Sequence, residues 1–507
     1  MSGQQVDPSF LALPYRSLGD TALARAQELG ASHADFRFER VRYQDLAVRD
    51  AVLQSASDRE DLGFAVRVVH QGAWGFAAGV VLTEEEAVRV AETAVAVARV
   101  AATMTPVPVE LAPEPVHPDV TWVSAYDVNP LDVPVAEKAE VLVGWTERLR
   151  AGAAVDHASA YLMQVQENKY YADLTGTLTT QQRVRMQPGF EAMGTGADTF
   201  DSMASIAPPV ARGWEYVVGS GPERWDWDTE VDEVPELLAE KLKAPSVEAG
   251  SYDLVIHPSN LWLTIHESIG HATELDRALG YEANYAGTSF ATYDKLGNLQ
   301  YGSGVMNVTG DRTLLHGLAT VGYDDEGVAT QSWDIVRDGV LVGYQLDRAM
   351  GHLKPELNDG RSNGCAYADS PGHIPIQRMA NVSLQPAPDG PSTDELIGRV
   401  ERGIYVVGDK SWSIDMQRFN FQFTGQRFYR IQDGELVGQL RDVAYQATTT
   451  EFWGSLEAVG GPETWVLGGA FNCGKAQPGQ VASVSHGCPT SLFRGVNILN
   501  TTDEAGH

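Results

Sequence analysis

The apolar and polar residues in the first half of the chain follow two periods, one typical of helices and one typical of strands. Residues 20–29 have a helical pattern. Strand-like stretches follow at residues 33–48, 63–69, 73–78, 159–167 and 170–186. This mixture predicts an α+β module.

Longer amphipathic segments predict helices that pack against this sheet. Residues 82–104 form one such segment, in which Thr83 can cap the first turn and the acidic residues after it favour the positive end of the helix dipole. Further helices are predicted at residues 135–151 and 234–243. Residues 244–250 then have the composition of a linker.

The linker divides the chain into a predicted N-terminal α+β domain, residues 1–245, and a C-terminal domain, residues 246–507. The second part consists mainly of short strands and turns, with a helix expected at residues 392–403. Two stretches, residues 335–343 and 431–438, each place an Asp-Gly pair between strand formers, which predicts two β-hairpins. The C-terminal domain is therefore expected to be β-rich, apart from a helix that carries two histidines.

Composition narrows the class of protein. A chain of 507 residues exceeds what one hydrophobic core usually supports, in agreement with two or more domains. The formal net charge of −31 opposes binding to nucleic acid and to anionic membranes. The sequence shows neither a signal peptide nor an apolar run that could span a membrane, and three cysteines are too few for a disulfide framework. A cytoplasmic protein is expected.

One motif carries the most chemistry, the stretch His266-Glu267-Ser268-Ile269-Gly270-His271. Two imidazoles can hold a metal ion, and the carboxylate between them can take a proton from water. Five residues correspond to about 140° around a regular helix, which points the two rings apart. We therefore predict a wider turn of the π type at residues 266–271, with Gly270 as the position where the backbone deforms at least cost.

Another interpretation stays open, in which this segment is a buried helix whose histidines bond to the backbone. Glu267 argues against it, because a carboxylate is costly to bury without a cation. A catalytic zinc ion also needs a third protein ligand. Glu274, Asp276, His486 and Cys473 are the candidates, and spacing does not choose among them.

These residues resemble the TldD/PmbA family of metalloproteases, and specifically its TldD-type catalytic subunits. The resemblance rests on separated motifs in family order across roughly residues 250–500. They are the histidine motif with Glu274 and Asp276, the turn at 324–327, the hairpin at 338–344, residues 360–361, residues 403–405, and residues 473–475 with 479–480. The resemblance implies an α+β N-terminal domain, a β-rich C-terminal domain, one Zn²⁺ ion per catalytic chain and proteolysis of unstructured peptides.

The resemblance also assigns roles to individual residues. The family's metal ligands carry over to His266, His271 and Cys473, and its catalytic carboxylate carries over to Glu267. Non-catalytic partner subunits of the family lack the histidine motif, which places this chain on the catalytic side. A PmbA-like partner subunit, or self-association as a homodimer, is implied as well.

The predicted reaction is hydrolysis of a peptide bond, in which Glu267 takes a proton from water and passes it to the leaving amine. A thiolate ligand makes zinc a weaker Lewis acid, so additional donors to the oxyanion are expected. Arg361, Tyr344 and His486 are candidates for that role. A narrow cleft bordered by strand edges would select unfolded or flexible peptides.

Two other functions remain open. A zinc amidohydrolase acting on small or cyclic peptides would use the same residues in a closed pocket. A non-catalytic peptide-binding or scaffold subunit would hold a structural zinc with four protein ligands, for example Cys473 together with Cys488. Both Cys488 and His486 depart from the TldD-type pattern, so Cys488 stays an alternative sulfur ligand.

Overall fold

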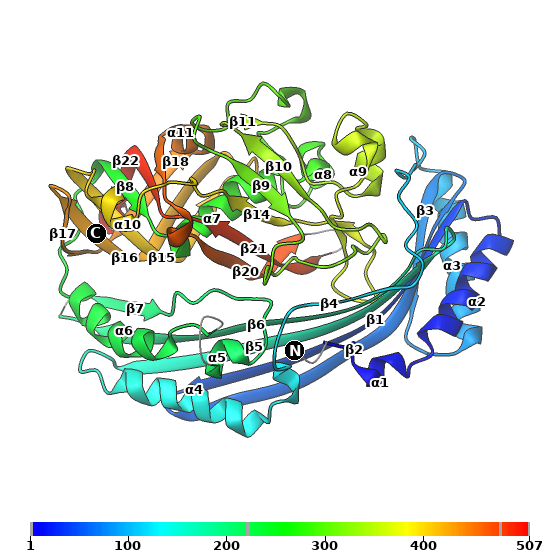
Figure 1. Cartoon of the computed structure of the whole chain (residues 1–507), viewed down its shortest axis with the longest axis horizontal. Coiled ribbons are helices and arrows are strands. Elements are labelled where there is room, and N and C mark those ends of the chain that lie inside the picture. The colour runs from blue at the N-terminus through cyan, green and yellow to red at the C-terminus, as the bar shows by residue number, and fades with distance from the viewer. Residues whose placement is uncertain (1–3, 198, 220–223, 476–478, 505–507) are drawn as a thin grey trace.

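The computed structural model describes residues 4–197, 199–219, 224–475 and 479–504. The first half of the chain forms a long curved sheet, and the second half lies against its concave face (Figure 1). The strands of this sheet are β1 (His33–Arg49), β2 (Val52–His70), β3 (Ala73–Gly79), β4 (Val120–Val123), β5 (His157–Asp173), β6 (Leu178–Thr195) and β7 (Phe200–Ala204). Their order is β3-β2-β1-β5-β6-β4, with β7 beside β6.

Helices cover both ends of this sheet (Figure 1). They are α1 (Pro8–Leu11), α2 (Tyr15–Glu28) and α3 (Glu84–Ala102) at one end, and α4 (Val135–Arg150), α5 (Glu215–Val218) and α6 (Trp227–Lys241) at the other. The predicted cap of α3 is confirmed, since the Thr83 side chain accepts a hydrogen bond from the Glu86 N–H. The predicted α+β class is confirmed too.

The central strands are buried on both faces, because helices cover one face and the second half of the chain covers the other. On β1, Phe36 and Phe38 belong to the core under α2 and α3. Arg37, on the opposite face, donates to the His373 carbonyl of the second half. Charged positions that alternate with apolar ones in this strand are therefore interior positions.

Two strand predictions were wrong. The predicted gap at residues 168–169 does not exist, because β5 continues to Asp173 and the chain turns afterwards. The Asp173 carboxylate accepts hydrogen bonds from the N–H groups of Thr175 and Thr177 and so stabilises the turn. Strand β2 begins earlier than predicted, because its polar first half is mostly exposed and lacks an apolar period.

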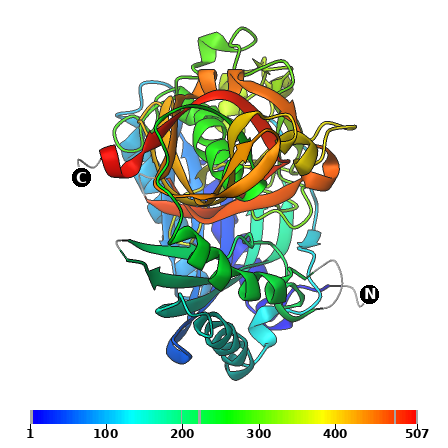
Figure 2. The same cartoon turned by 90° about the vertical axis from the view of Figure 1, so that its left-hand side faces the viewer.

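The second half contains a closed barrel. Its strands are β8 (Gly250–Ile256), β15 (Arg402–Ile414), β16 (Asn420–Gln432), β18 (Val443–Thr448) and β22 (Ser491–Asn500), with β17 (Glu435–Leu440) and β19 (Leu456–Val459) attached. They pair in the order β15-β8-β22-β18-β16, and β16 pairs with β15 again. Helix α7 (Pro258–Ile265) follows β8 directly and lies within this ring (Figure 2).

Contacts inside the barrel fix the position of α7. The Asn260 side-chain amide donates to the carbonyls of Gly408 and Thr424, both at 3.0 Å. Leu261 and Ile265 belong to one buried cluster with the aromatic side chains of β16 and β18. The helix that leads into the histidine motif is thus held from all sides.

A second layer faces α7 from outside the barrel. It consists of β9 (Val308–Asp311), β10 (Ser332–Arg337), β11 (Val340–Leu341), β12 (Ala366–Tyr367), β13 (Ile376–Gln377), β14 (Asn381–Leu384), β20 (Val466–Lys475) and β21 (Gln480–Cys488). Short helices lie between the strands, namely α8 (Leu275–Ala278), α9 (Arg348–Leu353), α10 (Thr393–Ile397) and α11 (Thr449–Gly454), and α12 (Thr501–Glu504) follows β22. The β-rich second half is confirmed.

Both predicted hairpins are present. Asp338 and Gly339 turn β10 into β11 with φ of 49° and 79°, and Asp433 and Gly434 turn β16 into β17 with φ of 51° and 82°. Positive φ at both turn positions is the conformation that Asp-Gly pairs favour in two-residue hairpins.

Two helix predictions need correction. The helix expected at residues 392–403 ends at Ile397, and β15 begins at Arg402, where the chain turns into the barrel. Helix α6 begins at Trp227, earlier than predicted, because the Asp226 carboxylate caps it by accepting from the Thr229 N–H. The proposed linker falls between α6 and β8, and the domain boundary itself stays a prediction.

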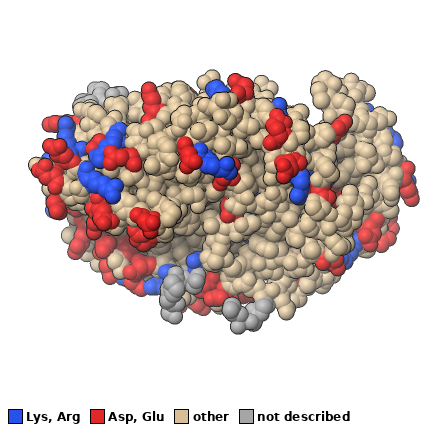
Figure 3. Space-filling view, turned by 45° about the horizontal axis from the view of Figure 1, so that its top comes forward, with Lys and Arg blue, Asp and Glu red and all other residues tan. Residues whose placement is uncertain are grey.

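The charges on the surface and the lengths of the helices concern the prediction that the protein binds neither nucleic acid nor membranes. In Figure 3, acidic side chains are spread over the visible face and are densest at its left-hand end, with basic side chains among them. No helix in the described part of the chain has the length and apolar character that crossing a membrane requires.

Candidate metal centre

The histidine motif forms the widened turn that its spacing predicts. Helix α7 passes into a π-helical turn over His266–Gly270 and then into a 3₁₀ turn over His271–Thr273. The extra residue per turn brings both rings to one side, with their centroids 4.7 Å apart. In the alternative interpretation both histidines bond to the backbone, whereas here His266 contacts His486 and His271 contacts Glu274.

The role of Gly270 differs from the predicted one. Its φ of −53° is open to any residue, so the turn does not depend on the conformational freedom of glycine. A Cβ atom at this position would instead lie 2.5 Å from the Met379 sulfur. The turn thus packs closely against the segment that leads into β14.

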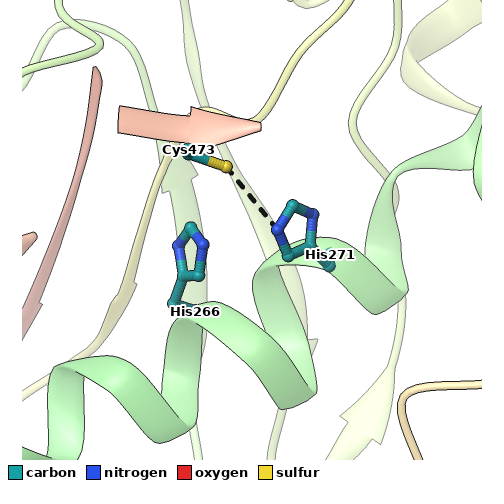
Figure 4. A group of neighbouring side chains, drawn as sticks. All are labelled: His266, His271 and Cys473. Carbon is teal, nitrogen blue, oxygen red and sulfur yellow. Dashed lines mark hydrogen bonds between the residues drawn. The ribbon is translucent and has the colours of Figure 1, made fainter. Parts of the chain in front are cut away.

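Cys473 approaches the two rings from strand β20 (Figure 4). Its Sγ lies 3.5 Å from His271 Nε2. The potential ligand atoms of His266, His271 and Cys473 all lie within 4.8 Å of one another, and all three side chains are buried. The pairing of β20 with β21 shifts register between Ala470 and Cys473, and such a bulge re-aims the side chain.

Hydrogen bonds fix which nitrogen of His266 is free. His486 Nδ1 lies 2.8 Å from the Val382 carbonyl, which can only accept, so this nitrogen carries the proton. His486 Nε2 therefore accepts from His266 Nδ1, 2.7 Å away. The lone pair of His266 is left on Nε2. His486 thus orients His266. Both of its ring nitrogens are engaged, so His486 has none left for the oxyanion of a substrate.

Glu274 orients the ring of His271, as His486 orients that of His266. Its carboxylate lies 2.9 Å from His271 Nδ1, which leaves His271 Nε2 free toward Cys473. Burial acts to raise the pKa of Glu274, but Lys475 and His271 hold it well below its ordinary value. Lys475 also pairs with Asp276 at 2.7 Å. Glu274 and Asp276, both weighed as ligands from the sequence, are therefore engaged with other groups.

Glu267 contacts Arg418, a residue that the sequence analysis did not single out. Its carboxylate accepts a hydrogen bond from Arg418, in the turn between β15 and β16. Burial acts to raise the pKa of Glu267, but the two histidines and Arg418 lower it below its ordinary value. Arg418 lies 151 positions away in a turn without a recognisable motif, so no sequence signal connects it with Glu267.

The cysteines differ in their electrostatic surroundings. Burial acts to raise the pKa of Cys473, but His271 and Arg378 bring it below the ordinary value of a thiol. Burial alone raises the pKa of Cys488, whose Sγ lies 3.8 Å from the Pro258 carbonyl and belongs to the apolar core. The thiolate form that metals prefer is favoured only at Cys473 of these two.

The other two candidates for oxyanion binding have partners elsewhere. The Tyr344 hydroxyl donates to the Ala291 carbonyl at 2.8 Å, and the side chain is buried. The Arg361 guanidinium pairs with Glu114 of the first half of the chain at 2.6 Å. Both contacts stabilise the fold around these residues.

Comparison with known families agrees with this geometry. Residues 249–500 match the model described as PmbA/TldA metallopeptidase C-terminal domain, and residues 34–98 match PmbA/TldA metallopeptidase domain 1. The chain belongs to the TldD/PmbA family. The resemblance seen in the sequence is thereby confirmed.

Several relatives in the TldD/PmbA family are similar along nearly their whole length. A metalloprotease from Methanothermobacter thermautotrophicus is 27% identical over 92% of this chain and 96% of its own. A zinc metalloprotease TldD homolog from Saccharolobus solfataricus is 23% identical, with the same coverage of 92% and 96%. The crystal structure of TldE from Thermococcus kodakarensis has the same fold, with 16% identity, a TM-score of 0.68, and coverage of 95% of this chain and 99% of its own. These matches support a metallopeptidase of the TldD/PmbA family.

Proposed function

We propose that this chain is a zinc-dependent peptidase that hydrolyses unfolded or flexible peptides. In this proposal His266, His271 and Cys473 hold the ion, and Glu267 is the general base. The observation that carries it is the convergence of one imidazole nitrogen from each of His266 and His271 with the Cys473 sulfur, all within 4.8 Å of one another, beside the Glu267 carboxylate.

The spacing of one pair of donors supports zinc. Two ligands on a tetrahedral zinc ion lie roughly 3.3 to 3.6 Å apart, given Zn–N and Zn–S bonds of about 2.0 and 2.3 Å. The 3.5 Å between Cys473 Sγ and His271 Nε2 falls in this range. Three protein ligands leave one position open, as in catalytic zinc sites, and both histidines have the outer hydrogen bonds that such ligands usually have.

Glu267 supplies the proton transfers. A bound zinc ion contributes Lewis acidity, which polarises the scissile carbonyl and makes water more acidic. Glu267, ionised before substrate binds, takes one proton from the water that attacks the carbonyl carbon. It then gives this proton to the nitrogen as the C–N bond breaks.

Limited access supports a flexible substrate. The side chain of Arg418 is 15% exposed and that of Glu267 is 8% exposed. A folded domain cannot bring a peptide bond to groups this deep, whereas an extended chain can. A second subunit of the same fold, either PmbA-like or another copy, is proposed to border this opening. The three cysteines form no disulfide with one another, and a cytoplasmic location is proposed with this.

Glu267→Gln tests the assignment of the base. The variant keeps every proposed ligand, so we expect wild-type zinc content by elemental analysis and a fall in kcat of about 100-fold or more on flexible peptides. Removal of metal with a chelator should abolish wild-type hydrolysis, and added zinc should restore it.

The exposed carboxylate variant Glu463→Gln is the matched control and should behave like wild type. Assays run with and without a PmbA-like subunit separate a missing partner from a missing activity. Normal turnover by Glu267→Gln would remove Glu267 from the mechanism.

A further inference from the structure

Arg418 occupies a backbone conformation that arginine rarely adopts. Its φ of 62° lies in the left-handed region, which favours glycine. The turn around it is fixed by Asp415, whose carboxylate accepts from the N–H groups of Phe419 and Asn420 at 2.8 and 3.0 Å. Strained positions held in place by their surroundings are concentrated at functional sites.

The guanidinium of Arg418 contacts the Glu267 carboxylate and has one N–H group without a hydrogen-bond partner among the described residues. One terminal nitrogen donates to Glu267. The Nε–H is buried and has no hydrogen-bond partner among the described residues. A buried donor without a partner is costly, and a ligand that accepts its hydrogen bond removes that cost.

We propose that Arg418 is a catalytic residue that binds the oxyanion of the substrate. The inference rests on the proposed function, which needs such a donor because a thiolate ligand weakens the Lewis acid. The three donors considered from the sequence all have other partners, whereas Arg418 lies beside the general base.

The proton transfer itself explains how Arg418 changes partners. As the water oxygen bonds to the carbonyl carbon, the C=O π pair moves onto oxygen, and the proton of the water goes to Glu267. Glu267 thereby loses its charge at the moment when the substrate oxygen gains one. Arg418 exchanges the first anion for the second, so its interaction with substrate is stronger in the transition state than in the ground state.

Arg418→Gly separates this role from a structural one. Glycine suits the left-handed backbone, and the hydrogen bonds of residue 418 to the turn are made by its main chain, so the turn should keep its conformation. Zinc content should stay at the wild-type level, KM should change less than about threefold, and kcat should fall about 100- to 1000-fold. Arg418→Lys, which keeps the charge and loses the planar fork, should recover only part of kcat.

Asp433→Gly is the matched control, because Asp433 also has positive φ and lies at the other end of β16. It should leave kcat unchanged. A phosphinic pseudopeptide, whose tetrahedral anion mimics the oxyanion, gives a readout without turnover. Zinc-loaded Arg418→Gly should bind it about 100-fold more weakly than zinc-loaded wild type.

The outcomes are distinguishable. If wild-type protein shows no zinc-dependent hydrolysis with or without a partner subunit, the proposed function itself fails. If wild type hydrolyses peptides and Arg418→Gly keeps its kcat or its affinity for the phosphinic peptide, only the role of Arg418 is overturned. A loss of zinc from the variant would also overturn it, because Arg418 would then act on the metal centre.

Discussion

Two buried thiols lie near the histidine turn, and their electrostatic surroundings differ. Cys473 faces His271 across 3.5 Å, whereas Cys488 packs among apolar side chains at the start of α7. A sulfur ligand must be ionised to hold zinc, and the charges around Cys473 favour that form. The metal should therefore respond to a change at only one of these cysteines.

Cys473→Ala should weaken zinc binding at least 100-fold, because loss of a ligand costs more than the roughly 10- to 100-fold cost of losing an outer hydrogen bond. Cys488→Ala should retain zinc and lose about 1 kcal/mol of stability. Competition with a zinc-binding dye measures the first effect, and urea unfolding measures the second. The opposite pattern would assign the sulfur ligand to Cys488.

At the residue scale, the sequence revealed the groups that share a motif. His266, Glu267 and His271 stand out because their types and spacing are unusual. Arg418 does not, since its proposed role depends on a turn that brings it to Glu267 from a distant segment. His486 is a candidate from the sequence alone, but its contact with His266 exists only in the folded chain.

At the scale of elements, the widened turn between α7 and α8 decides where the histidines point. Five-residue spacing predicted it correctly, because a regular helix cannot place both rings on one side. The turn also packs against Met379, which the sequence could not show. Helix starts with a capping residue were predicted well at α3 and less well at α6, where Asp226 lies outside the apolar pattern.

Gly270→Ala should disturb the turn, since the added methyl group would lie 2.5 Å from the Met379 sulfur. We expect a loss of about 1 to 3 kcal/mol in unfolding free energy and weaker zinc binding. Gly144→Ala is the control, because nothing lies within 4 Å of its added Cβ on α4, and it should stabilise the protein by about 0.5 to 1 kcal/mol. Urea unfolding with and without zinc tests both; an unaffected Gly270→Ala protein would contradict the packing argument.

At the scale of the whole molecule, the two halves meet through buried ion pairs. Arg67 on β2 contacts Asp35 on β1 at 2.7 Å and Glu326 of the second half at 2.9 Å. The sequence could not reveal this interface, because charges that alternate along a strand usually indicate a face exposed to solvent. Only the packing of the second half shows that these positions are interior.

Asp35→Asn should make the free energy of unfolding less dependent on pH in acid. Burial acts to raise the pKa of Asp35, but Arg67 and His33 lower it to about 2, below its ordinary 3.8. A lowered carboxyl pKa adds stability above pH 4, here about 2 kcal/mol, and this contribution is lost as the pH falls toward 2. Urea unfolding should show that the variant is less stable than wild type at pH 7. The difference in stability between the two proteins should become smaller between pH 4 and pH 2. A difference that stays constant would show that Asp35 is not the titrating group.

The proposed zinc ligands come from distant parts of the polypeptide, since Cys473 follows His271 by 202 positions. During synthesis the ribosome must release almost the entire chain before the thiol can meet the imidazoles. A nascent or prematurely terminated product that lacks β20 therefore has no complete centre. On the proposed function, such a product should bind no zinc at this site and hydrolyse no peptide.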